Sequence, residues 1–412
     1  MSEWKKVKLG DYCEITSSKR CLASVRSKNG IPFFCSKEII CLDKGEDFEP
    51  TDFIPEELYN DIKAKYGVPT SGDLLLTTRG TNGIPYIYKP SDKFYFADGN
   101  LSWFKNFGKE LSPQYLYYWF KSPLGIHEVD AISKGTAQKA VPIDGLRRIV
   151  LLTPSLRIQN RIVEILSRYD SLIENYQKQL KLLEEAAQRL YKEWFVDLHF
   201  PGHESTNIVD GVPEGWEIVT INDVTSKITT GLNPRKNFVL GNGNNYYVTI
   251  KNMANNTIYL DDKCDKIDDE AIEKINKRSD LKTGDILFSG IGTIGRVCLI
   301  DIPTNNWNVS ESVFTLRAND IVTKEFLYLM LLSPDMQNYC QSNAHGAAQK
   351  GIRMADLKAY SFYLPPFGVI QKFTNLVTPT IKKVSSIRNQ IRLLTEARDR
   401  LLPRLMNGEI AV

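Results

Sequence analysis

The feature that most constrains the fold is an internal repeat. Trp4-Lys5-Lys6-Val7 recurs 212 positions later as Trp216-Glu217-Ile218-Val219, and Ser71-Gly72-Asp73 recurs at the same offset as Thr283-Gly284-Asp285. Three further matches keep an offset of 212 or 211: Gly80-Thr81-x-Gly83 with Gly292-Thr293-x-Gly295, Gly135 to Lys139 with Gly346 to Lys350, and Glu185 to Leu190 with Glu396 to Leu401. Ordered matches at one offset indicate a tandem duplication. We therefore expect two copies of one fold.

Each half presents the same order of predicted elements. Short apolar runs between Gly, Pro and Asn residues predict strands, for example at 85–88 and 296–300. Short aromatic helices are expected at 114–120 and 325–330. A proline then introduces a long helical segment in each half, after Pro154 and after Pro365-Pro366.

Both long segments have the hydrophobic period of a coiled coil. The apolar residues of the first segment advance 28 residues in eight steps, about 3.5 per step: Ile162, Ile165, Tyr169, Leu172, Tyr176, Leu180, Leu183, Ala187 and Leu190. The second has compatible spacing, although Pro379 predicts a kink or a late helix start. So narrow a stripe favours pairing of the two segments with each other over packing of each on its own domain.

The predicted fold class is α+β, with two tandem-duplicated globular α/β domains separated by two long helices that form an antiparallel coiled coil with pseudo-two-fold symmetry. The first globular domain is expected at residues 1–152 and the first long helix at 153–198. A linker follows at 199–215, then the second globular domain at 216–364. The second long helix and the C-terminal tail take up 365–412.

A glycine fingerprint in the second half suggests a nucleotide site, but its counterpart in the first half does not. Gly290-x-Gly292-x-x-Gly295 has the spacing of a dinucleotide-binding turn. Thr78 stands at the position of Gly290 in the first half, and both stretches continue into strand-forming residues. A strand, a glycine turn and a second strand are therefore expected. A phosphate-binding loop is also excluded, because Arg296 stands where that motif requires Lys.

Two motifs of the second half resemble those of amino-methyltransferases. Phe288-Ser289-Gly290-Ile291-Gly292 resembles their cofactor loop, and Leu364-Pro365-Pro366-Phe367 resembles their catalytic motif. Leu364 has no side-chain oxygen to accept a hydrogen bond from the amine of the target base. A self-contained N6-adenine methyltransferase is therefore a minor alternative. No other catalytic constellation and no metal-ligand set stands out, so we predict no catalytic residue, metal or cofactor in this chain.

Composition is that of a soluble globular protein, and it restricts the surroundings of the chain. No apolar run is long enough to span a membrane, the N-terminus lacks a secretion signal, and the seven cysteines form no CxxC pair. These features predict a cytoplasmic protein with reduced thiols. The net charge is only +3, so any DNA-binding surface must be local.

Several short stretches carry a resemblance to one protein family, and the resemblance covers essentially the whole chain. Two of them lie at the ends of the long helices, Leu190 to Asp197 with Pro201-Gly202 and Leu401 to Ile410, and the others are the two Gly-x-Ala-Gln-Lys motifs. The chain resembles the specificity (S) subunit of type I restriction-modification systems.

The resemblance implies two target-recognition domains, each of which reads one half of a split asymmetric target in double-stranded DNA. It implies that the helices set the gap and dock two methylation subunits, which supply S-adenosylmethionine and catalysis. Restriction subunits that use ATP are further implied partners, and no membrane is involved. The main alternative is a two-headed scaffolding protein without DNA sequence specificity.

Basic residues in the repeated loops are the candidate DNA contacts, since Arg can read guanine edges and Lys more often contacts phosphate. They are Lys19, Arg20, Arg79, Lys134, Lys139, Arg235, Lys236, Arg296, Lys350 and Arg353. A second group is expected to dock partners or to structure loops: Gln138, Gln349, Tyr191, Trp194, Phe195, Leu402, Arg404 and Leu405. For any single cation, a solvated surface position is an equally good interpretation. The aromatic helices suggest base stacking, but their spacing favours core packing.

Overall fold

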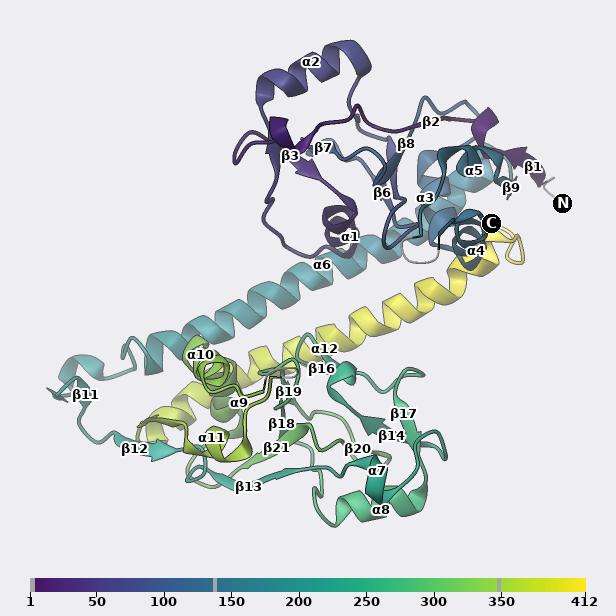
Figure 1. Ribbon diagram of the computed structural model, residues 1–412. Coiled ribbons are helices and arrows are strands. Elements are labelled where there is room, and N and C mark those ends of the chain that lie inside the picture. Colours follow the sequence, from purple (N-terminus) through teal and green to yellow (C-terminus); the bar gives the residue numbers. More distant parts are fainter. Residues whose placement is uncertain (1–3, 136–138, 347–349) are drawn as a thin grey trace. The chain divides into compact units, whose positions relative to one another are not determined.

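The computed structural model describes residues 4–135, 139–346 and 350–412. It divides into two compact units, unit 1 with Met1–Asn175 and Ile391–Val412, and unit 2 with Tyr176–Gln390. Each unit combines small sheets with short helices and a segment of each long helix (Figure 1). The predicted α+β class is confirmed.

Unit 1 is built on a four-stranded antiparallel sheet and a three-stranded mixed sheet. The four-stranded sheet has the order β2 (Glu14–Thr16), β8 (Leu101–Lys105), β5 (Leu74–Thr77), β6 (Pro85–Ile87). The three-stranded sheet has the order β4 (Phe53–Ile54), β3 (Ile31–Phe34), β7 (Tyr95–Phe96), with β3 and β7 parallel. A separate antiparallel pair joins β1 (Lys5–Lys8) to β9 (Val150–Thr153).

Unit 2 repeats these sheets strand for strand. Its four-stranded sheet has the order β13 (Thr225–Thr230), β21 (Val313–Ala318), β18 (Ile286–Ser289), β19 (Val297–Leu299). Its three-stranded sheet has the order β17 (Asp265–Ile267), β14 (Asn245–Val248), β20 (Trp307–Val309), with β14 and β20 parallel. The separate pair is β12 (Glu217–Thr220) with β22 (Ser361–Leu364). Two short hairpins are added, β10–β11 (Ile208–Val209, Val212–Pro213) and β15–β16 (Met253–Ala254, Thr257–Ile258). The matching order confirms the duplication.

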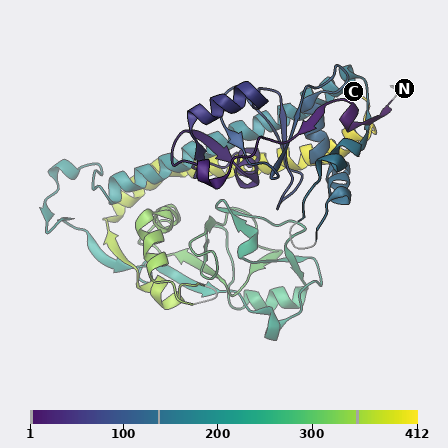
Figure 2. The ribbon, with the colours of Figure 1, turned by 45° about the horizontal axis from the view of Figure 1, so that its top comes forward.

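The short helices also repeat, and they start with the same capping signals. In unit 1, α3 (Pro113–Lys121), α4 (Pro123–Ile132) and α5 (Ile143–Arg148) follow the large sheet, and α9 (Lys324–Leu332), α10 (Pro334–Ser342) and α11 (Met354–Ala359) do so in unit 2 (Figures 1 and 2). Hydroxyls of Ser112 and Ser122 accept hydrogen bonds from the first turns of α3 and α4, and those of Thr323 and Ser333 do the same for α9 and α10. The remaining helices are α1 (Ser36–Lys44), α2 (Glu56–Tyr66), α7 (Pro234–Asn237) and α8 (Asp269–Asn276).

The aromatic helices serve the cores, as their spacing predicts. Tyr115, Trp119 and Phe120 of α3 are buried in the core of unit 1, and Phe326 and Tyr328 of α9 are buried in the core of unit 2. Buried rings are not available to stack on DNA bases, so the base-stacking interpretation is excluded.

The repeated Ser/Thr-Gly-Asp motif closes the turn before the central strand of each large sheet. Oδ2 of Asp73 accepts a hydrogen bond from the Thr70 amide at 2.8 Å, and Oδ2 of Asp285 accepts one from the Lys282 amide at 2.9 Å. The motif is therefore structural.

The glycine fingerprint forms a hairpin in both units, as predicted. Strand β18 pairs with β19, and β5 pairs with β6, both antiparallel. Gly292 and Gly295 have φ angles of 79° and 88°, and their counterparts Gly80 and Gly83 both have 82°. Glycine tolerates this left-handed region without strain. Since a strand and not a helix follows the third glycine, the turn has no helix N-terminus to bind a pyrophosphate.

Two 40-residue helices complete the fold, α6 (Leu156–Phe195) and α12 (Phe367–Met406). In unit 1 they run antiparallel: Leu402 and Leu405 share a core with Ile162 and Leu166, and the Arg398 guanidinium lies 2.7 Å from the Asp170 carboxylate. In unit 2 they are also antiparallel: Arg388 pairs with Glu184, and Phe373 contacts Tyr191 and Trp194.

Two predictions about these helices were wrong in detail. Helix α12 begins at Phe367, twelve residues before Pro379, so the proline does not delay the helix start. Pro379 is exposed, and the preceding Thr378 hydroxyl donates to the Thr374 carbonyl at 2.7 Å. Leu172 was expected in the apolar stripe, but its side chain is 47% exposed and the neighbouring Ile173 is buried instead.

Candidate nucleic-acid interface

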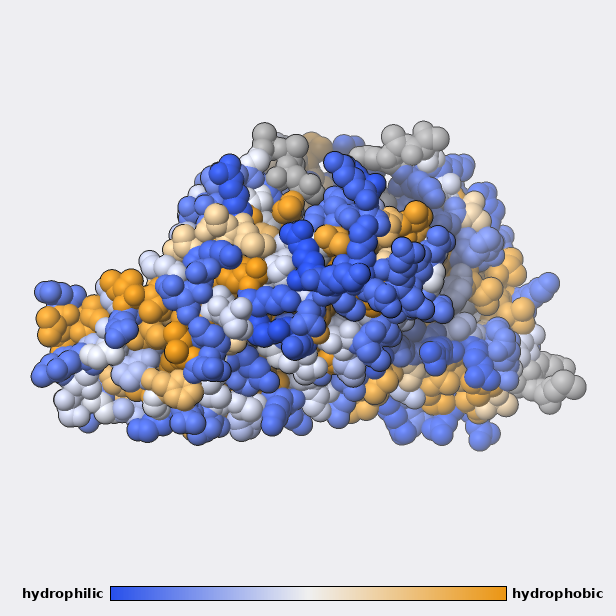
Figure 3. All heavy atoms as spheres, turned by 90° about the horizontal axis from the view of Figure 1, so that it is seen from below, coloured by the Kyte–Doolittle hydropathy of each residue, from blue (hydrophilic) through white to orange (hydrophobic). Residues whose placement is uncertain are grey.

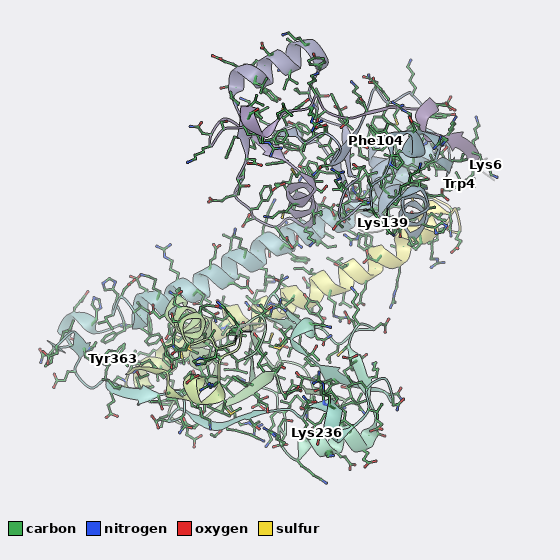
Figure 4. All side chains as sticks on the ribbon, in the orientation of Figure 1. Trp4, Lys6, Phe104, Lys139, Lys236 and Tyr363 are labelled. Atoms are coloured by element: carbon green, nitrogen blue, oxygen red, sulfur yellow. The ribbon has the colours of Figure 1, made fainter. Side chains whose placement is uncertain are left out.

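Two loops far apart in the sequence of unit 1, the turn at Arg79 and the loop between Lys134 and Ala140, meet at Ala140. Ala140 forms β-bridges with both Arg79 and Lys134, and its amide donates to the Lys134 carbonyl at 2.8 Å. Lys139, labelled in Figure 4, precedes Ala140 directly. Arg79, Lys134, Lys139 and Ala140 form what we name the unit 1 bridge cluster. The structure thus brings together three of the five cations predicted for the first half.

The same arrangement recurs in unit 2 around Gly351. Gly351 forms β-bridges with Ile291 and His345, and its amide donates to the His345 carbonyl at 2.8 Å. Exposed Lys350 precedes Gly351, and exposed Arg353 caps the N-terminus of α11 two residues later. The unit 2 bridge cluster is Ile291, His345, Lys350, Gly351 and Arg353.

A backbone clamp holds the glycine turn in each bridge cluster. In unit 1 the Thr78 amide donates to the Asn100 carbonyl at 2.8 Å, and the Thr78 carbonyl accepts from the Val141 amide at 2.9 Å. In unit 2 the Gly290 amide donates to Ser312 at 3.0 Å, and its carbonyl accepts from Ile352 at 2.8 Å.

Gly290, the first glycine of the fingerprint, is required by packing. A Cβ at this position would lie 2.5 Å from Cζ of Phe314, inside van der Waals contact. The close approach of the Phe314 ring therefore accounts for this glycine without a nucleotide.

The early basic loops are anchored to the three-stranded sheets. The Lys19 amide donates to the Tyr95 hydroxyl at 2.6 Å, and the Gly231 amide donates to the Ser310 carbonyl at 3.3 Å. Residues 95–100 and 309–312 lead from these contacts to Asn100 and Ser312, whose carbonyls hold the glycine turns. One short segment therefore links each early loop to a bridge cluster. Lys236, labelled in Figure 4, lies with Arg235 on α7, and both are exposed.

The predicted cations differ in whether another side chain of the protein already pairs with their charged group. Lys139 pairs with Asp130 at 3.3 Å, Arg20 lies 4.0 Å from Asp98, and the Lys19 ammonium lies 5.0 Å from the centroid of the Tyr66 ring. Within the described ranges, the structure gives no intramolecular partner to the charged groups of Arg79, Lys134, Arg235, Lys236, Lys350 and Arg353. All six are exposed, and their charges are free to contact phosphates or bases.

Arg296 does not occupy the position that the sequence suggests. Its amide donates to the Ser289 hydroxyl at 2.8 Å, as the Ile84 amide does to Thr77 in unit 1, so Arg296 corresponds to Ile84 and not to Arg79. Its guanidinium donates to the Ile250 carbonyl at 2.9 Å and also to the Met253 carbonyl. We therefore assign Arg296 a structural role and withdraw the DNA contact predicted for it.

Most residues predicted to dock partners lie inside the units instead. Tyr191 and Trp194 are each 6% exposed and contact Phe373 in the core of unit 2, together with half-buried Phe195. Burial raises the pKa of Tyr191 well above its usual range.

Leu402 and Leu405 belong to the core of unit 1, so among the docking residues at the C-terminus only Arg404 is exposed, 3.5 Å from Glu409. The loop-structuring and docking predictions for Gln138 and Gln349 lie outside the described residues.

Sequence reasoning missed a pair of exposed leucines on the long helices. Leu182 of α6 is 66% exposed and Leu393 of α12 is 48% exposed, and the two stand 211 positions apart, at the offset of the repeat. Single exposed apolar side chains are common on protein surfaces, so it is their recurrence at the offset of the repeat that distinguishes this pair. In the sequence, the signal for both residues was a leucine that stands outside the apolar stripe of its helix. Figure 3 shows that hydrophobic residues are interspersed among hydrophilic ones on the face that it presents.

Residues 4–135, 139–346 and 350–412 contain no cluster of three or more His, Cys, Asp or Glu side chains suited to hold a metal ion. Over the same ranges, no helix combines the length and apolarity needed to cross a bilayer.

Comparisons with known proteins point to one family. A family model described as "Type I restriction modification DNA specificity domain" matches residues 1–185 and 213–391. The chain is 27% identical over 304 residues to the type I restriction enzyme MjaIX specificity subunit of Methanocaldococcus jannaschii, covering 73% of this chain and 69% of that protein. It is 22% identical to the type I restriction enzyme HindI specificity subunit of Haemophilus influenzae, with complete coverage of both.

A solved structure shares the fold. The S subunit of a type I restriction-modification system from M. genitalium aligns with a TM-score of 0.61 at 16% identity, covering 98% of this chain and 96% of that one.

Proposed function

The chain belongs to the type I restriction-modification DNA specificity family, and from this we propose how its two units divide the recognition of DNA. It is the non-catalytic specificity subunit of a type I restriction-modification complex, and it recognises a DNA target in that complex. Unit 1 reads one half of a split target and unit 2 reads the other. Because the two bridge clusters carry different side chains, the two half-targets differ in sequence.

The observation that carries this proposal is one loop arrangement built twice with different residues. Both clusters present exposed cations on a backbone held by equivalent hydrogen bonds, but the glycine turn carries a cation, Arg79, in unit 1 only. A fixed backbone with variable side chains suits base readout, since specificity depends on which groups reach the base edges.

We also propose that α6 and α12 set the gap between the half-targets. A helix of 40 residues at about 1.5 Å per residue spans about 60 Å. This length allows half-targets about one to one and a half DNA turns apart, at roughly 34–36 Å per turn.

Two methylation subunits are the proposed partners on these helices. Leu182 and Leu393 support this, because they give each unit an exposed apolar side chain at the same position of the repeat. The methylation subunits would bind S-adenosylmethionine, restriction subunits would use ATP, and the complex would act in the cytoplasm.

Reconstitution tests the recognition role. The chain is co-purified with the methylation subunit of its own system, and methyl transfer to a randomised DNA library is sequenced. We expect a single target made of two specific parts separated by a fixed number of unread bases, and no methyl transfer or S-adenosylmethionine binding by the chain alone. Partner binding without any sequence preference would support the scaffold alternative, and methyl transfer by the chain alone would support the self-contained methyltransferase.

Stoichiometry tests the docking sites. Native mass spectrometry should show two methylation subunits on the wild-type chain and one on either Leu182→Asp or Leu393→Asp. Val150→Asp is the control, since Val150 is 53% exposed and lies on β9, outside both long helices. Two bound subunits on both leucine variants would exclude these positions from the interface.

A further inference from the structure

The two units place opposite chemistry at one equivalent position. Arg79 and Ile291 each form a β-bridge to the central residue of their bridge cluster, Ala140 or Gly351. They stand 212 positions apart, the offset of the surrounding glycine turns. One unit therefore presents a guanidinium where the other presents an apolar side chain.

The backbone that carries Arg79 is held on several sides. The Arg79 carbonyl accepts a hydrogen bond from the Ser36 hydroxyl at 3.0 Å, and the same hydroxyl lies 3.1 Å from the Asn100 carbonyl. The preceding Thr78 is clamped by Asn100 and Val141, as described above. The N-terminus of α1, the loop at residue 100 and the segment Ala140-Val141 thus fix the backbone position of Arg79. Rigid support of this kind is what base readout requires, because a bidentate contact fails when the side chain is displaced.

The Arg79 side chain is exposed, and the described part of unit 1 offers its guanidinium no carboxylate, carbonyl or ring partner. The other arginine predicted for DNA contact in this unit, Arg20, lies within reach of Asp98. Of the two arginines predicted to contact DNA in unit 1, Arg79 is therefore the one whose backbone is held and whose guanidinium has no partner among the described residues.

Ile291 has a different environment. A Cβ at Gly351 would lie 3.3 Å from Cγ1 of Ile291, so the isoleucine side chain lies against the glycine and is half-buried. Ala140 replaces this glycine in unit 1. Isoleucine has no hydrogen-bonding group, and the contact open to it in a major groove is an apolar one with a thymine methyl.

We propose that Arg79 reads a guanine in the half-target of unit 1, and that no guanine is selected from the equivalent position of unit 2, where Ile291 stands. Arginine donates two parallel hydrogen bonds to O6 and N7 of guanine, which distinguishes G·C from the other pairs. This inference rests on the proposed division of the target between the units, and it names the residue that sets one base pair of the first half-target.

The test compares Arg79→Lys and Arg79→Ile in the reconstituted complex with the methylation subunits. Methyl transfer is measured on DNA in which every pair of both half-targets is varied in turn, at two salt concentrations. Lysine keeps the positive charge but loses the planar two-donor geometry, so it separates base reading from phosphate contact. Lys93→Gln is the control, since Lys93 is an exposed cation of unit 1 outside the bridge cluster whose ammonium lies 3.0 Å from the Glu56 carboxylate.

Both Arg79 variants should lose discrimination at one G·C pair of one half-target, by about 5- to 150-fold, and leave the other half-target unchanged. Lys93→Gln should keep the discrimination at that pair. Thermal unfolding of each variant checks that the chain is folded.

Two results would overturn the inference while leaving the proposed function intact. One is full discrimination by Arg79→Lys together with a uniform loss by Arg79→Ile that shrinks at high salt, which is the behaviour of a phosphate contact. The other is unchanged discrimination by both variants. Absence of a two-part target in the wild-type complex would instead refute the proposed function, and this inference with it.

Discussion

Replacing Trp194 by alanine should destabilise unit 2 strongly, because the structure places this side chain in a core. Trp194 is 6% exposed, and its ring centroid lies 5.7 Å from that of Phe373, which is fully buried. Burial of about 200 Å² of indole at about 25 cal/mol per Å² corresponds to about 5 kcal/mol. Measured losses for such large-to-small changes are about 3–5 kcal/mol. For a unit of this size, the unfolding midpoint should fall by roughly 6–20 °C.

Calorimetry of the full chain measures this change, and hydrogen exchange of peptides from α6 assigns the transition to unit 2. Val196→Ala is the control on the same stretch, since Val196 is 43% exposed and should shift the midpoint little. An unchanged midpoint in Trp194→Ala, combined with lost binding of the partner subunits, would refute the core placement. It would also restore the docking role that the sequence suggested.

Three further predictions address local features. Gly125→Ala in α4 should destabilise unit 1 by about 1–3 kcal/mol in denaturant titration, because the new Cβ would lie 2.1 Å from the Trp119 carbonyl oxygen; Gly108→Ala, with its nearest contact at 3.5 Å, should be tolerated. Lys350→Gln should weaken DNA binding of the complex about equally for all sequences and reduce the slope of log K against log salt by about 0.9; a change confined to one base pair would contradict a phosphate contact. Burial raises the pKa of the Cys298 and Cys340 thiols from 9.0 to about 12, so the unfolded chain ionises first and the stability of unit 2 should decline as the pH rises from about 9 towards 12. Thermal midpoints measured across this pH range check the prediction. If a Cys340→Ala variant loses as much stability over this range as the wild type does, the Cys340 thiol is not a source of the decline.

The repeat made most of the fold predictable. Matching offsets at Asp73 and Asp285, and at Gly80 and Gly292, located the same turns in both halves before any strand pairing was known. The glycine turn was predicted correctly because Thr78 at the position of Gly290 removed the nucleotide interpretation. Local patterns carry this information, since capping, turn formation and hydrophobic period depend on neighbouring residues.

The candidate site was less predictable, because it depends on which loops meet. Arg79 and Arg296 were both predicted to contact DNA, but the hairpin makes Arg296 the equivalent of Ile84, and its guanidinium donates to the carbonyls of two residues far from it in the sequence. The aromatic residues at the end of α6 looked like a docking surface, since no sequence pattern shows that Phe373, far along the chain, covers them. Long-range contacts decide both cases.

The measurement that tests the central claim most directly is a genome-wide map of N6-methyladenine in the native host, with the gene intact, deleted, and restored with the Arg79→Ile variant. The account predicts one methylated target of two specific parts with a fixed gap, lost on deletion and relaxed in only one part by the variant. An unchanged map after deletion, while the partner methylation gene is expressed, would contradict the claim that this chain directs DNA recognition.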